Sequence, residues 1–297
     1  MTDRSGAVYD LGYTPYDGER LGRKGAVRSV VKDGVYRVLG LRRKARKKIL
    51  PWSLLALAMI PAAVFVGLAF LLPDFTPEAE SPFGGYVEYF VLVGAIVLLF
   101  VSLAGPELLI PDRRQGVLDV YSSRPLLPSD YVGARAGALL IMMGAFLLIP
   151  EIGMYVGFAA LDADGFLNAL VSDADMLPRI LAATAVYVLA YVPLAMFVAA
   201  FVNRKSAATG IYLAVMIGIN GIAEALQETS SVPGARYAAL VPPPNNADYV
   251  VRWIFGETGA EALPFRAGFE PELSLLVIVA VAIVLSATVV IRYRRLM

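Results

Sequence analysis

The chain has 297 residues, of which 58% are hydrophobic and 17% are charged, and its formal net charge at pH 7 is +1. It contains no Cys and no His, which excludes disulfides, thiol nucleophiles, imidazole bases and zinc sites built on these residues. A composition this apolar, with repeated runs near the length that crosses a bilayer, indicates an integral membrane protein.

The N-terminal segment precedes any apolar run of spanning length. Residues 1–23 form a tail rich in Tyr, Gly and Asp, which suits either contact with a partner protein or a spacer. Four valines then recur at helical spacing between basic residues: Val27, Val31, Val35 and Val38. This pattern predicts an amphipathic helix in the inner membrane interface, followed by a basic cluster that meets anionic lipid. A solvated basic tail that only enforces topology is the alternative.

Six apolar runs follow, and each is long enough to cross a bilayer. They lie at about 51–72, 88–109, 131–161, 179–202, 206–224 and 273–291. The third run is interrupted at Pro150 and Glu151, which indicates either a kinked or a tilted helix. The runs predict an all-α integral membrane fold with six transmembrane helices, and the late first run argues against a secretory signal peptide.

The basic residues are distributed unevenly between the segments that join these runs. Most Lys and Arg residues lie before the first run, between the second and third, between the fourth and fifth, and at the C-terminus, whereas the other loops are acidic. This asymmetry predicts that both termini are cytoplasmic and that the chain is a multi-pass protein of the cell (plasma) membrane. The basic residues then serve topology and contact with membrane lipid, so no nucleic-acid partner is expected.

The segment of residues 106–135 joins the second and third runs and is the most informative part of the chain. It is denser in charges, glycine and proline than a simple connection needs. We expect a charged turn at Asp112, Arg113, Arg114 and Gly116, a short helical or extended piece at 117–121, and a closing turn at Arg124, Pro125 and Pro128. A short rigid element joined to two spans transmits the displacement of a soluble motor. The alternative is that the arginines are only topology anchors.

This segment, DRRQGVLDVYSSRPLLPSDYVGAR, together with the amphipathic helix and the six spans, resembles the membrane subunit of ABC transporters of the ABC-2 type exporter superfamily (type V exporters). The matching positions are Asp112, Arg113, Arg114, Gly116, Leu118, Ser123, Arg124, Pro125, Leu126 and Tyr131. Where members of that family often have Lys after the Tyr, this chain has Arg135. The resemblance implies a six-helix domain that dimerises and a coupling helix that contacts the ATPase. These positions, with Glu107, are therefore the expected ATPase-coupling residues.

The sequence contains no G-x-x-x-x-G-K-[ST] motif, the phosphate-binding loop that an ATPase of this kind would need. We expect a non-catalytic subunit that binds no cofactor or metal, with ATP and Mg bound by a separate ABC ATPase subunit. One six-helix unit is half of the usual permease, so the resemblance also implies a second permease copy or a similar permease subunit. The expected organisation is a cytoplasmic tail at 1–23, an interfacial helix with its basic cluster at 24–48, and a transmembrane domain at 49–297.

Three polar residues inside the apolar runs are candidates for a translocation pathway or an outer gate: Glu151, Asn220 and Glu224. An ionised group in hydrocarbon costs about 2.5 to 3.5 kcal/mol or more unless it faces a cavity or a partner. Positions near the outer headgroups are the alternative for both carboxylates. The outer segment 227–272 is too long for a turn, and its sequence VPPPNNADYVVRWIFGETG predicts a short interfacial helix with Asn245 and Asn246 at its cap.

Together these features predict the permease subunit of an ABC exporter. A membrane anchor or resistance factor that binds an ATPase without moving a solute stays open as an alternative, as does a secondary transporter. An intramembrane enzyme is disfavoured, because carboxylates alone would have to carry the catalysis. The resembling family lines its pathway with the second and fifth spans, and their apolar composition here favours an amphipathic or lipid-like cargo.

Overall fold

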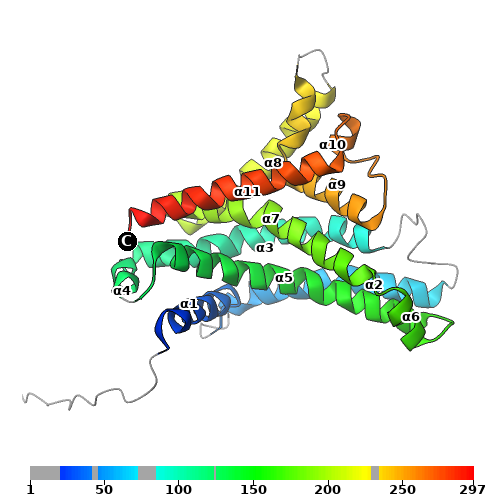
Figure 1. Ribbon diagram of the computed structural model, residues 1–297, viewed down its shortest axis with the longest axis horizontal. Coiled ribbons are helices and arrows are strands. Elements are labelled where there is room, and N and C mark those ends of the chain that lie inside the picture. The colour runs from blue at the N-terminus through cyan, green and yellow to red at the C-terminus, as the bar shows by residue number, and fades with distance from the viewer. Residues whose placement is uncertain (1–20, 42–45, 73–84, 124, 229–233) are drawn as a thin grey trace, which may run out of the picture.

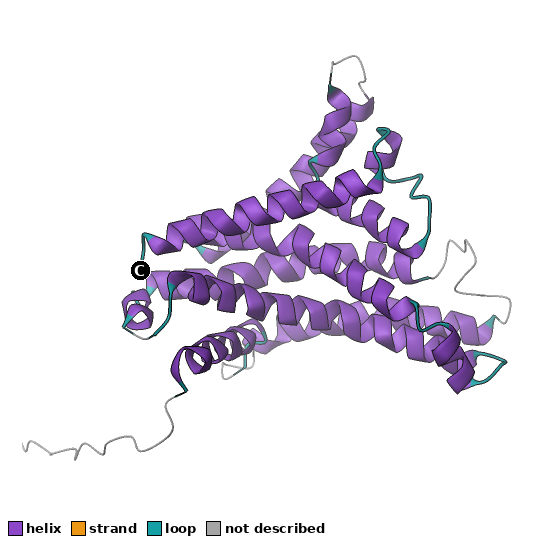
Figure 2. Cartoon of the chain, viewed as in Figure 1, coloured by secondary structure: helices purple, strands orange, loops and turns teal. Residues whose placement is uncertain are grey.

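The computed structural model is a bundle of helices and describes residues 21–41, 46–72, 85–123, 125–228 and 234–297. No strand occurs in this part of the chain (Figure 2). The six helices that are long and apolar enough to cross a membrane are α2 (Arg46–Leu71), α3 (Tyr86–Arg114), α5 (Pro128–Leu161), α7 (Met176–Phe201), α8 (Lys205–Glu228) and α11 (Pro271–Arg294). Each coincides with one of the apolar runs, so the six predicted spans and the multi-pass architecture are confirmed.

Shorter helices lie between and before the spans. They are α1 (Gly22–Val38), α4 (Leu118–Ser122), α6 (Phe166–Ser172), the 3-10 helix η1 (Ala235–Leu240), α9 (Pro243–Phe255) and α10 (Leu263–Arg266). One end of the bundle carries α1, α4 and the C-terminus, and α6 lies at the opposite end (Figure 1). We call these the α4 end and the α6 end. Residues 1–20 of the predicted tail, residues 42–45 of the predicted basic cluster and Arg124 lie outside the described residues.

The core lies along α7, the most buried of the six spans. In its most apolar 18-residue segment 67% of the residues are buried, against 22% in the corresponding segments of α2, α8 and α11. Helix α7 packs against α3, α5, α8, α9 and α11, and α5 packs against α1, α2, α3 and α11 as well. Helices α2, α8 and α11 leave large apolar side chains exposed, which suits helices that face lipid or another subunit.

Close helix contacts are made where a glycine faces another small or branched residue. A Cβ atom added at Gly34 of α1 would lie 2.5 Å from the Cβ of Ala138 on α5, and one at Gly105 of α3 would lie 3.0 Å from the Cβ of Ala195 on α7. Lipid supplies no hydrophobic drive between helices, so such close backbone approach is a main source of packing energy. Gly34 thus fixes α1 against the spanning helices.

Helix α1 confirms the predicted amphipathic helix, but its apolar stripe is covered by protein. Val38 is buried, and Val27, Val31 and Val35 are partly buried against the core. The side chains that α1 leaves exposed include the basic residues Lys24, Arg28 and Lys32. The valines therefore attach α1 to the bundle, and the face that remains for lipid headgroups or solution is the basic one.

The predicted charged turn is wrong in its first three residues. Helix α3 continues through Asp112, Arg113 and Arg114, and the turn begins only at Gln115, with Gly116 at a φ of 65°. Helix α5 begins at Pro128, whose fixed φ suits a first helical position. The connection between the two spans is therefore short, and the side chains of its flanking helical turns face neighbouring helices instead of a loop.

Two further expectations can be compared directly with the structure. The third span is one continuous helix of 34 residues that runs through Pro150 and Glu151.

The short helix expected in the outer segment is α9, but its N-cap is Pro242, not an asparagine. Asn246 lies one turn inside, where its Nδ2 donates a 2.8 Å hydrogen bond to the Pro242 carbonyl.

The contact at Gly34 gives a test of how α1 is held. Gly34→Ala should lower the free energy of unfolding by about 1 to 3 kcal/mol, because the added methyl group overlaps Ala138. Gly133→Ala on α5 is the matched control: nothing lies within 4 Å of the added Cβ, and it should be neutral or stabilise by about 0.5 to 1 kcal/mol. Thermal unfolding in detergent compares the two, and equal stabilities would contradict the close α1–α5 contact.

Candidate functional site

Helix α4 is held between α3 and α5 by tight turns. At the first turn the Val117 amide donates a 3.1 Å hydrogen bond to the Asp112 carbonyl, which closes the end of α3. At the second, the Leu127 amide donates a 3.0 Å hydrogen bond to the Asp130 carboxylate, which caps the start of α5. The short helical piece expected at 117–121 is confirmed as α4, and little slack separates it from either span.

The two faces of α4 differ in exposure. Leu118 is buried, and Tyr121 is turned toward the bundle, with its ring centroid 5.2 Å from that of Tyr131 on α5. Asp119, Ser122 and Val120 are exposed, and Val120 shows 55% of its surface. A single helical turn thus presents an isolated apolar side chain between polar ones at the α4 end.

Behind α4 lies a buried group of charged and phenolic side chains, which we call the ion cluster: Asp33, Arg37, Asp112, Tyr121, Tyr131 and Arg135. At its centre the Arg135 Nη2 donates a 2.6 Å hydrogen bond to the Asp112 Oδ2. Neither side chain has any exposed surface. Asp112 also accepts hydrogen bonds from the Arg37 Nη1 at 2.5 Å and from the Tyr131 hydroxyl at 2.8 Å. Asp112 of α3 is therefore bound by α1 and α5 together.

Asp33 of α1 makes the cluster symmetrical in charge. Its Oδ2 lies 2.8 Å from the Arg135 Nη1 and 2.8 Å from the Arg37 Nε. Two carboxylates therefore share two guanidinium groups, which offsets a burial cost of several kcal/mol for each of the fully buried ions Asp112 and Arg135. An imbalance of one charge would leave that cost uncompensated.

Tyr121 joins α4 to the ion cluster. Its hydroxyl accepts a 3.2 Å hydrogen bond from the Arg135 Nη2. Burial, together with the nearby Asp112 charge, raises the pKa of Tyr121, so its hydroxyl stays protonated at neutral pH. Helix α4 is thereby tied to a side chain that also binds α1 and α3.

Arg113 and Arg114 are adjacent but have different environments. The Arg113 Nη1 donates to the Ala200 carbonyl at 2.7 Å, and its Nη2 donates to the carbonyls of Ala199, at 3.1 Å, and Val202. The Arg292 Nε of α11 donates to the same Ala200 carbonyl at 2.7 Å. Two cations thus bind the free carbonyls at the end of α7, where the helix dipole is negative. Arg114 is exposed, so it is the arginine of this pair that offers a surface.

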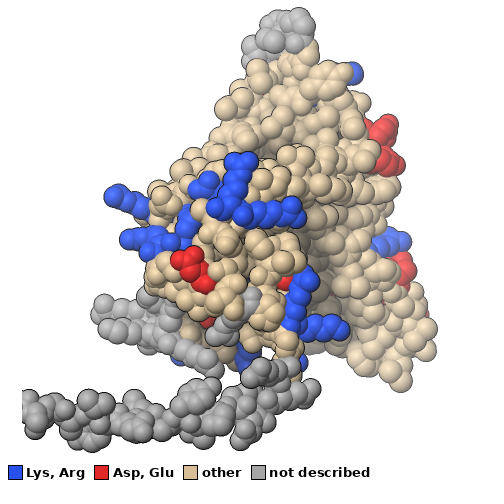
Figure 3. Space-filling model, turned by 60° about the vertical axis from the view of Figure 1, so that its left-hand side comes forward, with Lys and Arg blue, Asp and Glu red and all other residues tan. Residues whose placement is uncertain are grey.

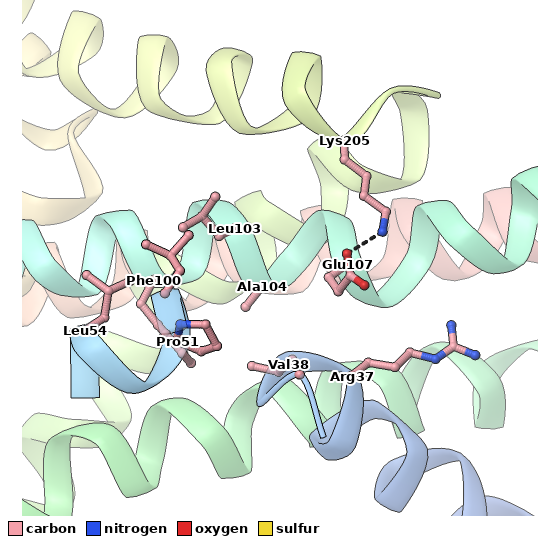
Figure 4. Close-up of a pocket in the computed structure, with 11 residues that line it drawn as sticks. Arg37, Val38, Pro51, Leu54, Phe100, Leu103, Ala104, Glu107 and Lys205 are labelled. Carbon is pink, nitrogen blue, oxygen red and sulfur yellow. Dashed lines mark hydrogen bonds and ion pairs between the residues drawn. The ribbon is translucent and has the colours of Figure 1, made fainter. Parts of the chain in front are cut away.

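Glu107 lines a pocket at the α4 end with a volume of about 390 Å³. It forms an ion pair with Lys205 at the start of α8 (Figure 4). Leu54, Phe100 and Leu103 gather on the other side of the pocket, and Arg37 and Val38 line it from α1 (Figure 4). The pocket combines an apolar wall with a charged pair, and α1, α2, α3 and α8 all contribute to it.

The remaining residues of the predicted coupling segment have local structural roles. Gly116 supplies the turn after α3, and Leu126 is buried between α4 and α5. The Ser123 Oγ donates a 2.9 Å hydrogen bond to the Val120 carbonyl, and Pro125 is exposed. None of these four binds the ion cluster.

The three predicted pathway residues do not lie together. Glu151 is buried in α5, about 30 Å along the helix from Tyr131. Asn220 and Glu224 share one face of α8, where the Asn220 Oδ1 is buried without a hydrogen-bond partner and Glu224 is exposed. Helix α8 packs mainly on α3, α7 and η1.

Asp33, Arg37 and Tyr121 belong to the site but are not among the residues that the sequence analysis assigned to it. One signal in the sequence points to the first two, because Asp33 is the single acid within 22–38 and stands four residues before Arg37. Tyr121 carries no such signal, since its partner Arg135 becomes its neighbour only through the fold.

No protein-family model matches the chain, and no curated protein is significantly similar to it. Its function is therefore inferred from the geometry of these residues.

The charge balance of the ion cluster can be tested by breaking and restoring it. Asp112→Ala should lower the free energy of unfolding by about 3 to 5 kcal/mol, because one buried positive charge is left in excess. Asp119→Ala removes a carboxylate from the exposed face of α4 and should change the free energy of unfolding by less than about 0.5 kcal/mol.

The double variant Asp112→Leu with Arg135→Met removes one charge of each sign and should recover most of the lost stability, measured by thermal unfolding in detergent. A double variant no more stable than Asp112→Ala alone would contradict charge balance as the reason for the loss.

Proposed function

We propose that this chain is the permease subunit of an ABC transporter of the exporter type, with α4 as the helix that couples it to a separate ATPase subunit. The observation that carries the proposal is the two-sided arrangement of α4. Val120 and its polar neighbours face solution, while Tyr121 is hydrogen-bonded to the buried Arg135. A partner that pushes on the exposed face moves a helix that is bound to α5 and is linked through Arg135 to α1 and α3.

The tight turns on both sides of α4 support this role. A motor outside the membrane moves membrane helices only if the connecting element is short and stiff. Here three residues separate α4 from the end of α3 and five separate it from the start of α5, and the ion cluster ties both spans to α1. A movement of α4 is thus passed to the second and third spans and to α1 as one body.

The distribution of charge supports a cytoplasmic position for α4. Lys and Arg side chains gather over the α4 end (Figure 3), where the exposed arginines include Arg114, Arg204, Arg294 and Arg295. Acidic residues such as Asp164 and Asp175 flank α6 at the other end. By the positive-inside rule the α4 end faces the cytoplasm, which gives cytoplasmic termini in the plasma membrane.

The exposed spans and the pocket at Glu107 suggest how a cargo is handled. The apolar faces of α2 and α8 fit a second permease subunit, and the pocket beside them has an apolar wall and one charged pair. Such a lining fits an amphipathic or lipid-like cargo. ATP and Mg are bound by the partner ATPase in this proposal.

The coupling surface is tested with variants at its exposed residues. Val120→Glu combined with Arg114→Glu should abolish recovery of a P-loop ATPase when the tagged chain is purified from its native membrane, because both changes alter the exposed face without touching the ion cluster. Vanadate-sensitive ATP hydrolysis in the purified sample measures the recovery.

Arg294→Glu reverses an exposed charge at the same end, on α11 and not on α4, and it should leave the ATPase bound. If the wild-type chain brings down no ATPase, or if the double variant retains it, α4 is not the coupling helix. Stimulation of the hydrolysis by amphipathic solutes would distinguish a transporter from an anchor.

The orientation is tested by single cysteines, since the chain has none of its own. Cysteine in place of Asp164 beside α6 should react with an impermeant maleimide added to intact cells, whereas cysteine in place of Ser122 on α4 should react only after the cells are opened. Both positions are exposed, so accessibility within the fold does not bias the comparison. The reverse pattern would move α4 to the outside and exclude ATPase coupling.

A further inference from the structure

Glu151 of α5 is the one wholly buried acid outside the ion cluster among the described residues. Its side chain has no exposed surface, and neither carboxyl oxygen has a hydrogen-bond partner. No Lys or Arg of the described chain acts on its charge. Asp112 is buried to the same extent, but two arginines and a tyrosine stabilise its negative charge. Glu151 has no such partner in the described chain.

The elements packed around Glu151 bring phenols toward it, and Arg179, the one basic residue of α7, is paired with Asp175 instead. Its charge acts on Tyr86 and Tyr89 of α3 and on Tyr187 of α7. The Tyr187 hydroxyl already donates to the Phe90 carbonyl at 3.0 Å, and the Tyr89 hydroxyl has no partner. The apolar spans 49–71 of α2 and 273–291 of α11 contain no charged residue, and neither does α6. Helix α1 contacts α5 with its charged residues in the ion cluster, at the far end.

An ionised carboxylate in such a place would lose its hydration and gain nothing in return, whereas a neutral carboxylic acid avoids most of that cost. We infer that Glu151 is a proton-binding site, which holds a proton in this closed arrangement of the bundle and exchanges it with the α6 end. The inference rests on the bundle alone and does not require the proposed ATPase partner.

The direction of exchange follows from the groups on either side of Glu151. Toward the α6 end, the charges of both Glu151 and Asp173 act on the phenol of Tyr86, and Asp173 is partly exposed between α6 and α7. Tyr86 is therefore within electrostatic reach of both the buried carboxyl and an acid that is partly exposed. Toward the α4 end, α5 presents buried apolar side chains such as Leu139, Met143 and Leu147. Tyr187 and Tyr191 of α7 stack with ring centroids 5.6 Å apart, but the Tyr187 hydroxyl is donated to the Phe90 carbonyl, so the proposed route runs through Tyr86 to the α6 end.

Binding of this proton is linked to the conformation of the bundle. Any rearrangement that admits water between α3, α5 and α7 lowers the cost of the ionised form and releases the proton to the α6 side. The closed bundle is therefore stabilised by acid on that side and is less stable once the carboxyl ionises. The exchange needs no other reactant, because the carboxylate takes a proton from water and later returns it.

The protonated state can be detected in the wild-type protein by chemical labelling. Dicyclohexylcarbodiimide is apolar and reacts with a carboxylic acid: the O–H adds across one C=N bond, and an O-to-N acyl shift gives a stable N-acylurea with no leaving group. Peptide mass spectrometry of the full chain in detergent at neutral pH should find this adduct on Glu151 and not on the exposed Asp164. A water-soluble carbodiimide with an amine nucleophile should show the reverse preference. No adduct on Glu151, or equal labelling of Glu151 by both reagents, would overturn the inference.

The exchange route needs a second measurement. The infrared C=O band of a protonated carboxyl should be present in the wild type, absent in Glu151→Gln, and shifted after transfer to D₂O. Tyr86→Phe should slow that shift by about tenfold, the effect of losing roughly one hydrogen bond from the path. Tyr237→Phe, at an exposed tyrosine of η1, is the control and should leave the rate unchanged. Exchange as fast in Tyr86→Phe as in the control would overturn the route through Tyr86, and absence of the band from the wild type would overturn the proton site.

Discussion

The ion pair between Asp112 and Arg135 is the constraint on which the α4 end of the molecule depends. Two ions without exposed surface must be matched in charge and hydrogen-bonded, or the fold loses several kcal/mol. Arg37 and Asp33 complete the match from α1, and Tyr131 completes it from α5. Helices that are far apart in the sequence are thus held together by the same charges.

The constraint also decides which residues are left for a partner. Asp112, Arg113 and Arg135 use their charges inside the molecule, on the ion cluster and on the end of α7. The side chains of Val120 and Arg114, in contrast, are both exposed. In the proposed function these exposed residues form the docking surface, and the ion cluster behind them lets the bundle follow the movement of the ATPase. Glu151 lies nearer the α6 end and has neither an ion-pair nor a hydrogen-bond partner among the described residues, so we infer that its carboxyl group is protonated.

Much of this fold follows from the sequence alone. Length and hydropathy locate the six spans, and valine spacing locates α1, because these signals lie within one helix. The sequence also singles out the charged residues of the segment 106–135 but does not predict their surroundings. Arg113 and Arg114 look equivalent in sequence, yet on a helix they point about 100° apart, one toward the end of α7 and the other to the surface. The partners of Asp112 include Arg37, which is 75 residues away, so a reading of local patterns assigns Asp112 to a turn.

The central claim is that α4, α1 and the ends of α3 and α5 move as one body. It is tested most directly by distances between paired spin labels in this cysteine-free chain, with labelled chains diluted among unlabelled ones. Labels at the exposed positions Ser122 of α4 and Ser29 of α1 should give one narrow distance distribution, the same in the nucleotide-free and the vanadate-trapped complex with the ATPase. A change in that distance between the two states, or a broad distribution in either, would contradict the account.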